Sequence, residues 1–166
     1  MSTTTPSSDI SFADLRLSDA LLRALSEVGY ESPSPIQAAT IPHLIDQRDV
    51  LGQAQTGTGK TAAFTLPMLH RLAMSRSAQN KWGGRGIRVL VLTPTRELAA
   101  QVEESVRTYG KYLQLSSTVI FGGVGMNPQI ERVKQGIDIL VSTPGRLLDL
   151  QQQGFMDLSS VQMLVL

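Results

Sequence analysis

Short runs of apolar residues alternate along the chain with longer segments in which apolar residues recur every three or four positions. The short runs predict strands buried on both faces, and the longer segments predict amphipathic helices. Strands are expected at residues 50–51, 89–92, 119–121, 137–141 and 161–166. This alternation predicts an α/β domain with a parallel sheet, right-handed crossovers and helices on both faces of the sheet.

Two helices are expected before the first strand. Ser18 is a candidate cap for the first, which ends at Gly29. Ser34 opens the second with Pro35 at its first position, and Pro42 is expected to kink or shorten it. The residues of this helix expected to face inward are Ile36, Ala39, Thr40, Leu44 and Ile45. Later helices are expected from residue 61 and at about residues 96–112, 129–134 and 146–152.

Composition narrows the possible classes of protein. The chain has 166 residues, of which 42% are hydrophobic, enough for the core of one domain. It has no cysteine and only two histidines, which excludes disulfides, a thiolate metal site and a histidine metal cluster, and fits a cytoplasmic location. No apolar run is long enough to span a membrane, and residues 1–9 predict a disordered tail rather than a signal peptide. The net charge is only +1, so any contacts with nucleic acid must be local.

A glycine-rich loop lies between the first expected strand and the helix that follows it. It consists of Ala54, Gln55, Thr56, Gly57, Thr58, Gly59, Lys60 and Thr61. The glycines let successive N–H groups point at one phosphate, Lys60 supplies charge for the β and γ phosphates, and Thr61 offers a hydroxyl to Mg²⁺. The alternative is an ordinary glycine-rich turn with a solvated lysine. The position between strand and helix favours a nucleoside triphosphate site.

One junction occurs twice, each time where a strand ends and a helix begins. The two copies consist of Thr93, Pro94, Thr95 and Arg96, and of Thr143, Pro144, Gly145 and Arg146. Gly122 and Gly123 end the strand between them and expose bare backbone. The carboxyl ends of parallel strands meet at one edge, so three anion sites in a row there predict sequence-independent contacts with a nucleic-acid backbone. The alternative is simple helix capping, with the arginines paired to Glu97 or Asp149.

The segment before the glycine-rich loop contains a candidate base-recognition group. The Gln37 amide can form a bidentate pair with adenine, and Tyr30 can stack on the ring. Phe12 is an isolated aromatic residue near the end of the tail. The residues alone leave open that Gln37 lies on the surface and that Phe12 fills the core.

These motifs together resemble the first RecA-like lobe of DEAD-box ATP-dependent RNA helicases. The matching segments, in the family's order, are residues 29–37, 54–61, 94–99 (PTRELA), 122–123 and 143–146 (TPGR), with Phe12 placed as in the family's Q motif. The resemblance covers residues 10–166 as a partial ATP-binding domain with the Q motif at 12–37. Residues 111–113, 121–124 and 147–150 are most similar to the bacterial RhlE branch.

The resemblance implies a role for each motif, with ATP and Mg²⁺ as cofactors and RNA as partner. Gln37 would select adenine, with Phe12, Tyr30 and Pro35 around it, and residues 54–61 would hold the phosphates, Lys60 and Thr61 acting in catalysis and Thr61 on the metal. Contacts with RNA are implied for Pro94, Thr95, Arg96, Glu97, Gly122, Gly123, Thr143, Pro144, Gly145 and Arg146.

The sequence departs from this family at its end. The Asp-Glu-Ala-Asp box would follow residue 166, and the second RecA-like lobe would follow later. We therefore expect a fold that is incomplete at its C-terminus, with apolar surface exposed at the last strand, and a chain without ATPase or unwinding activity of its own. Two alternatives stay open: a non-enzymatic module that binds RNA or nucleotide, and another P-loop ATPase such as a DNA helicase.

Overall fold

The computed structural model describes residues 10–52, 59–123 and 125–166, so the expected tail at residues 1–9 lies outside the described residues. The elements are the 3₁₀ helix Phe12–Leu15, α1 (Asp19–Glu27), α2 (Pro35–Ile45), α3 (Lys60–Met74), β1 (Val89–Leu92), α4 (Arg96–Tyr109), β2 (Ser117–Ile120), α5 (Asn127–Gln135), β3 (Ile139–Ser142), α6 (Pro144–Gln152) and β4 (Met163–Val165). Among the described residues, no helix is long and apolar enough to cross a membrane.

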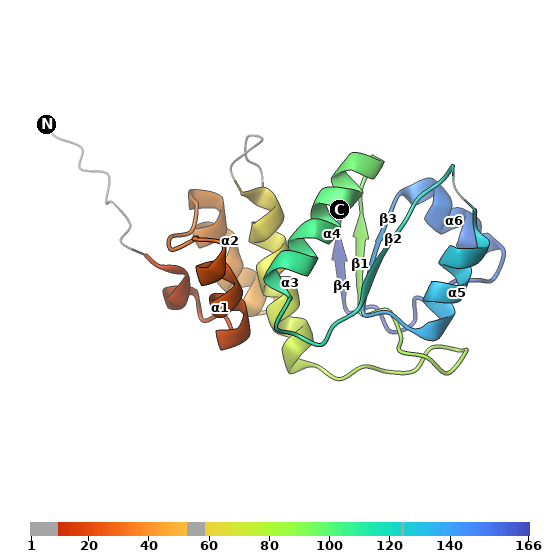
Figure 1. Cartoon of the computed structure of the whole chain (residues 1–166), viewed down its shortest axis with the longest axis horizontal. Coiled ribbons are helices and arrows are strands. Elements are labelled where there is room, and N and C mark those ends of the chain that lie inside the picture. Colours follow the sequence, from red (N-terminus) through yellow and green to blue (C-terminus); the bar gives the residue numbers. More distant parts are fainter. Residues whose placement is uncertain (1–9, 53–58, 124) are drawn as a thin grey trace, which may run out of the picture.

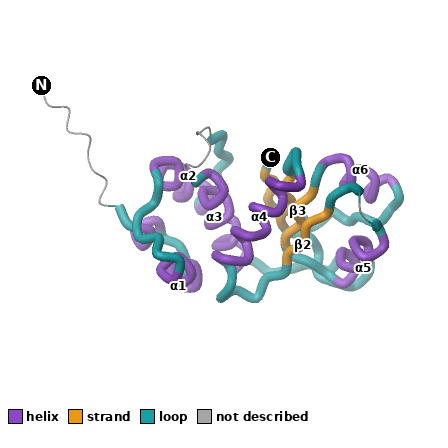
Figure 2. The backbone as a smooth tube through the Cα atoms, turned by 45° about the horizontal axis from the view of Figure 1, so that its top comes forward, coloured by secondary structure: helices purple, strands orange, loops and turns teal. Residues whose placement is uncertain are grey.

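The four strands form one parallel sheet in the order β2-β3-β1-β4. Figure 1 shows α3 and α4 on one side of this sheet and α5 and α6 on the other, with α1 and α2 outside α3. Figure 2 shows the same layers from a tilted view. The expected α/β architecture, with a parallel sheet and helices on both faces, is confirmed.

Successive residues of the central strands face opposite layers, because side chains alternate along a strand. Val89 and Val91 of β1 belong to the core that contains α3 and α4. Leu90 of the same strand and Leu140 of β3 belong to the second core, with α5 and α6. The unbroken apolar runs in the sequence therefore serve two cores at once.

The prediction of a strand at residues 50–51 is wrong. Val50 and Leu51 form no strand, and their side chains are 38% and 91% exposed. Val50 instead lines a cavity of about 570 Å³ whose other wall includes Met163 and Val165 of β4. A strand needs backbone hydrogen bonds to a neighbouring strand, and the cavity separates residues 50–51 from β4. Within the described residues β4 is an edge strand, and Leu164 is 57% exposed.

The prediction for α2 is correct at its start and wrong in two details. Ser34 caps the helix and Pro35 is its first residue, as expected. Ala39 is exposed, whereas Ile41, which was not among the expected core residues, is fully buried. Pro42 does not shorten the helix, which continues to Ile45.

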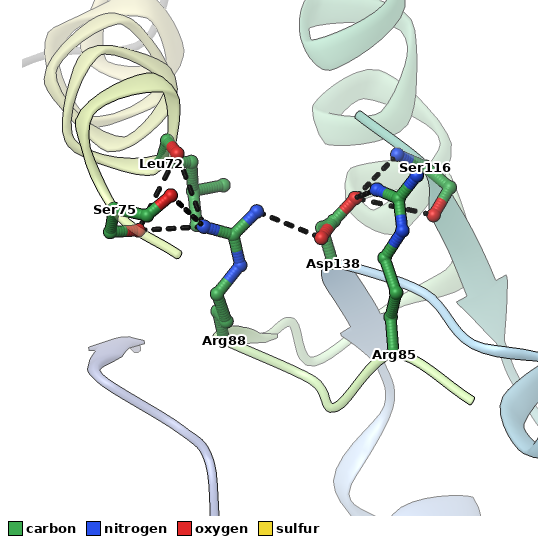
Figure 3. Close-up of polar contacts among 6 residues, drawn as sticks. All are labelled: Leu72, Ser75, Arg85, Arg88, Ser116 and Asp138. Carbon is green, nitrogen blue, oxygen red and sulfur yellow. Dashed lines mark hydrogen bonds and ion pairs between the residues drawn. The ribbon is translucent and has the colours of Figure 1, made fainter. Parts of the chain in front are cut away.

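A buried carboxylate joins four segments at the amino ends of the strands (Figure 3). Asp138 is fully buried, and its two oxygens accept hydrogen bonds from Arg88 Nη2 at 2.8 Å and Arg85 Nη1 at 2.9 Å. The Ser116 N–H donates to the same carboxylate at 2.9 Å. Arg88 is itself 4% exposed, and its other nitrogen donates to the carbonyl oxygens of Leu72 and Ser75 at the end of α3.

We predict that Asp138→Asn lowers the free energy of unfolding by about 3–5 kcal/mol, because the change leaves the buried Arg88 cation without its counter-charge. Urea unfolding followed by circular dichroism measures this loss. The control is Asp49→Asn, which removes the same charge from an exposed residue. A loss below about 1 kcal/mol would show that water or another group compensates Arg88.

His70 of α3 accepts a hydrogen bond that holds the start of α1. The Ser18 N–H donates to His70 Nδ1 at 3.1 Å. Burial, aided by the nearby Arg16 guanidinium, lowers the pKa of His70 below its usual value. Only an unprotonated Nδ1 can accept this bond, so the fold requires neutral His70.

We predict that the chain loses stability as the pH falls from 7 to 5. The unfolded chain binds a proton on His70 at a higher pH than the folded chain does. The free energy of unfolding therefore decreases once the pH is lower than the usual histidine pKa of about 6.5. In His70→Gln the slope of unfolding free energy against pH should be smaller over this range. The control His43→Gln keeps His70 and should keep the slope, and an unchanged slope in His70→Gln would contradict the assignment.

Candidate nucleotide and RNA interface

The structure brings Gln37 together with the end of the glycine-rich loop. Gln37 is 8% exposed, and its Nε2 donates to the Gly59 carbonyl at 3.1 Å. Its Oε1 accepts from the Ser34 N–H at 2.9 Å, as the return bond of a capping box. The Gln37 amide therefore joins the first turn of α2 to the N-cap of α3. The loop residues Ala54, Gln55, Thr56, Gly57 and Thr58 lie outside the described residues.

Position 59 favours glycine over residues with a side chain. Its φ is +86°, in the left-handed region, and a Cβ there would lie 2.3 Å from Gln37 Nε2. Lys60 and Thr61 form the first turn of α3, with Lys60 exposed and Thr61 half-buried. Among the described residues no ion pair of Lys60 and no hydrogen bond of the Thr61 hydroxyl is found.

The remaining residues of the Q motif have different surroundings. Phe12 is 4% exposed within the main core, and its N–H donates to the Glu31 carbonyl, so the structure favours the core alternative for this ring. Tyr30 is 54% exposed, and Pro35 is exposed at the first position of α2. Phe12 thus anchors the segment that carries Tyr30, through its buried ring and its bond to Glu31.

The first T-P-x-R junction caps α4 with its second threonine. Thr95 Oγ1 accepts from the Leu98 N–H at 3.2 Å. Thr93 is buried, and its N–H donates to the Ser142 carbonyl of β3. Pro94, Thr95, Arg96 and Glu97 are all exposed. The junction therefore presents a helix N-terminus, which favours anions, on a base fixed in the sheet.

Arg96 connects this junction to the glycine pair. Its Nη2 donates to the Gly122 carbonyl, and its guanidinium lies 5.0 Å from the centre of the Phe121 ring. Gly123 has a φ of +83°, and a Cβ there would lie 2.0 Å from Arg96 Nη2. Among the described residues Arg96 forms no ion pair with Glu97, so the alternative of a simple ion pair does not apply to this arginine.

Gln129 connects the second junction to the same loop. Arg146 Nη1 donates to Gln129 Oε1 at 3.2 Å, and Gln129 Nε2 donates to the Phe121 carbonyl at 3.2 Å. The Thr143 N–H donates to the Ile120 carbonyl of β2, while Pro144 and Gly145 are exposed at the start of α6. Sequence reasoning missed Gln129, because a glutamine in the first turn of a polar helix carries no distinguishing pattern.

The two junctions and the glycine pair lie where β1, β3 and β2 end and α4, α6 and α5 follow, at the carboxyl edge of the sheet (Figure 1). The helices α4 and α6 and the loop before α5 supply backbone N–H groups, and Arg96 and Arg146 supply positive charge. Among the described residues no group of three or more histidine or acidic side chains forms a metal site. The edge is therefore suited to a phosphate-rich ligand.

Comparison with known proteins decides the family. The family model described as DEAD/DEAH box helicase matches residues 34–166. The chain belongs to the DEAD/DEAH box helicase family. The expected RecA-like α/β fold is thereby confirmed.

Curated relatives of this DEAD-box chain carry the name ATP-dependent RNA helicase DeaD. The protein of that name from Klebsiella pneumoniae is 47% identical over 159 residues, which are 95% of this chain and 24% of the relative. The one from Mycobacterium tuberculosis H37Rv is 47% identical over 156 residues, which are 93% of this chain and 26% of the relative. The chain spans about a quarter of the length of these relatives.

We predict that Gly59→Ala destabilises the chain more than Gly29→Ala does. Both glycines have a positive φ, which costs a residue with a side chain about 1–2 kcal/mol, but nothing lies within 4 Å of a Cβ at Gly29. At Gly59 the methyl group also displaces the Gln37 amide, at a cost of about 1 kcal/mol for the lost hydrogen bond. Urea unfolding of both variants measures the difference.

A double-mutant cycle separates the two contributions. In a Gln37→Ala background, the difference between the changes at Gly59 and Gly29 should shrink, because the displaced amide is no longer present, while Ser34 Oγ still lies 3.1 Å from a Cβ at Gly59. If the difference persisted undiminished in that background, the contact between Gln37 and Gly59 would not be its source.

Proposed function

We propose that this chain forms the ATP-binding lobe of an ATP-dependent RNA helicase, in which RNA-stimulated ATP hydrolysis is coupled to local separation of a duplex. The observation that carries the proposal is the connection of three phosphate-suited segments at one edge through Arg96 and Gln129. Family membership and the name of the relatives support the reaction class.

ATP and Mg²⁺ are the cofactors of this proposal. Residues 54–61 would surround the phosphates, with Lys60 on the β and γ phosphates and the Thr61 hydroxyl on Mg²⁺. The residues fit these roles, since both side chains are free of other bonds within the described part of the chain and α3 directs its N-terminus there. Electrostatic stabilisation by the lysine and the metal is what phosphoryl transfer requires of the protein.

RNA would run along the carboxyl edge. Pro94, Thr95, Arg96 and Glu97 would hold its backbone at the first junction, Gly122 and Gly123 at the loop, and Thr143, Pro144, Gly145 and Arg146 at the second junction. Arg96 donates to the Gly122 carbonyl, which is uncharged, so this partner does not neutralise its charge and Arg96 remains able to attract phosphate. Such backbone contacts are independent of base sequence.

Gln37 would select adenine at a modest net gain. A bidentate amide–adenine pair contributes about 1–3 kcal/mol, but it replaces two bonds that Gln37 already makes, to Ser34 and Gly59, each contributing about 1 kcal/mol. The net free energy that Gln37 adds to ATP binding is therefore small. Its main effect would be to favour adenine over other bases. Tyr30, which is exposed, would lie against the base, while Phe12 acts through packing.

We predict that Gln37→Ala weakens ATP binding by about three- to tenfold and GTP binding less, because only adenine pairs with the amide. Titration with fluorescent ATP and GTP analogues measures both affinities. The control is Gln101→Ala, which changes an exposed glutamine on α4. An equal loss for both nucleotides would mean that Gln37 acts through Gly59 and not on the base.

We also propose that the chain of 166 residues does not hydrolyse ATP by itself. Its sequence has no Asp-Glu-Ala-Asp, and Asp138 is held by two arginines at the opposite edge. Asp149 lies within α6, and Asp157 lies in the loop before β4. RNA-stimulated phosphate release in a malachite-green assay would contradict this proposal.

The finer assignments belong to the same proposal. We infer an RhlE-like branch from residues 111–113, 121–124 and 147–150, although the relatives found carry the DeaD name. A second RecA-like lobe would complete the site, and the protein would act in the cytoplasm. Competition of single-stranded RNA against DNA of the same length separates this proposal from a DNA helicase.

A further inference from the structure

A rigid loop packs against the amino ends of the strands, away from the interface described above. Asn80 is 8% exposed, and its side chain is used wholly to shape this loop between α3 and β1. Its Nδ2 lies within 3.4 Å of the Arg85, Val133 and Lys134 carbonyl oxygens. Its Oδ1 accepts from the N–H groups of Trp82 and Gly84.

Two glycines let this loop meet α5 backbone to backbone. A Cβ at Gly84 would lie 2.5 Å from the Lys134 carbonyl oxygen, and one at Gly136 would lie 2.4 Å from the Arg85 nitrogen. Lys81 adds two bonds on the other side, from its N–H to Asp157 Oδ2 and from its Nζ to the Gly154 carbonyl, both at 2.9 Å. The loop is therefore fixed before any partner binds.

The fixed loop gathers cations and aromatic rings at one place. Lys81 Nζ lies 4.7 Å and Lys134 Nζ 5.9 Å from the centre of the Trp82 ring, and Lys134 Nζ lies 5.4 Å from that of Phe155. Trp82 and Phe155 are both half-buried. We call these four residues the Trp82 platform.

The Lys134 ammonium of the Trp82 platform has no acidic partner among the described residues, where its side chain forms neither an ion pair nor a hydrogen bond. Lys81 forms no ion pair there, but its charge helps to lower the pKa of Asp157 and is therefore partly compensated. The contrast is Lys111, which also lies over an aromatic ring, that of Tyr112, but whose Nζ forms an ion pair with Glu27. Asp157, on which the Lys81 charge acts, accepts from the N–H groups of Lys81 and Ser159.

We propose that the Trp82 platform is a second contact site for single-stranded RNA, with Lys81 and Lys134 on phosphates and Trp82 beside the adjoining sugar and base. Uncompensated cations next to aromatic rings are the means by which proteins bind single strands without regard to sequence. For its ligand class the proposal rests on the RNA binding proposed above, but the site itself is separate from that edge.

The position of α5 favours RNA over an acidic protein segment. Gln129, near the start of α5, belongs to the interface at the carboxyl edge, and Lys134, near its end, belongs to the Trp82 platform. At 1.5 Å per residue the two lie roughly 7.5 Å apart along the helix axis. An RNA strand bound at Gly122 and Gly123 therefore reaches the Trp82 platform within a few nucleotides. An acidic peptide bound at the platform would have no such second site to continue to.

Trp82 is the only tryptophan of the chain, so its emission reports on the platform directly. We expect a 20-nucleotide oligouridylate to quench this emission as it binds. The double change of Lys81→Gln and Lys134→Gln should weaken binding on the order of fivefold and lower the salt dependence of log affinity by about 1.4, for two lost phosphate contacts. Lys111→Gln, which removes a lysine that is already ion-paired, is the matched control and should change neither quantity.

A parallel titration of fluorescein-labelled oligouridylate, followed by anisotropy, measures RNA binding independently of Trp82. RNA that binds without quenching Trp82, and equally well to the double variant, would overturn the platform and leave the carboxyl-edge interface standing. Absence of any RNA binding would overturn both proposals. Equal quenching by polyglutamate would overturn the choice of RNA and assign the platform to acidic protein segments.

Discussion

The fully buried carboxylate of Asp138 is the constraint on which the arrangement of layers depends. Two arginines from the segment before β1 and an N–H from the segment before β2 bind one side chain before β3, so three strands begin at one fixed point. Arg88 extends this point to the last turn of α3, whose first turn carries Lys60 and Thr61. Because a buried charge is stable only with a partner, the Asp138 carboxylate and Arg88 together tie these four segments to one another.

The two edges of the sheet use charge in opposite ways. At the amino edge Arg88 and Asp138 are buried and neutralise each other, and their ion pair holds the starts of the strands in place. At the carboxyl edge Arg96 donates to the Gly122 carbonyl, which orients its guanidinium without cancelling the charge. The same residue type is thus structural in one place and open to anions in the other, and the difference lies only in the partner.

Sequence patterns predicted what is local. The start of α4 at Arg96 and of α2 at Pro35 follow from capping residues within the same few positions, and they are confirmed. The strand predicted at residues 50–51 is wrong, because strand formation depends on a neighbour that two apolar residues do not specify. The bond from Arg88 to Asp138 joins residues 50 positions apart, and the bond from Arg146 to Gln129 joins residues 17 positions apart. Periodic patterns in the sequence do not predict contacts at such separations. The roles proposed for individual site residues stay predictions.

Arg85 joins the two functions that the amino edge serves. Its guanidinium binds Asp138, while its backbone carbonyl accepts from Asn80 and its N–H side packs against Gly136. The loop that presents Trp82 is therefore tied to the same carboxylate that fixes the strands. Because a contact surface gains affinity when its groups are ordered beforehand, the stability of the ion network and the binding competence of the loop are one property of the fold. A change that loosens Asp138 should loosen both, whereas the half-buried Lys134 side chain contacts neither β1 nor α3 in the bonds described and can be changed without disturbing them.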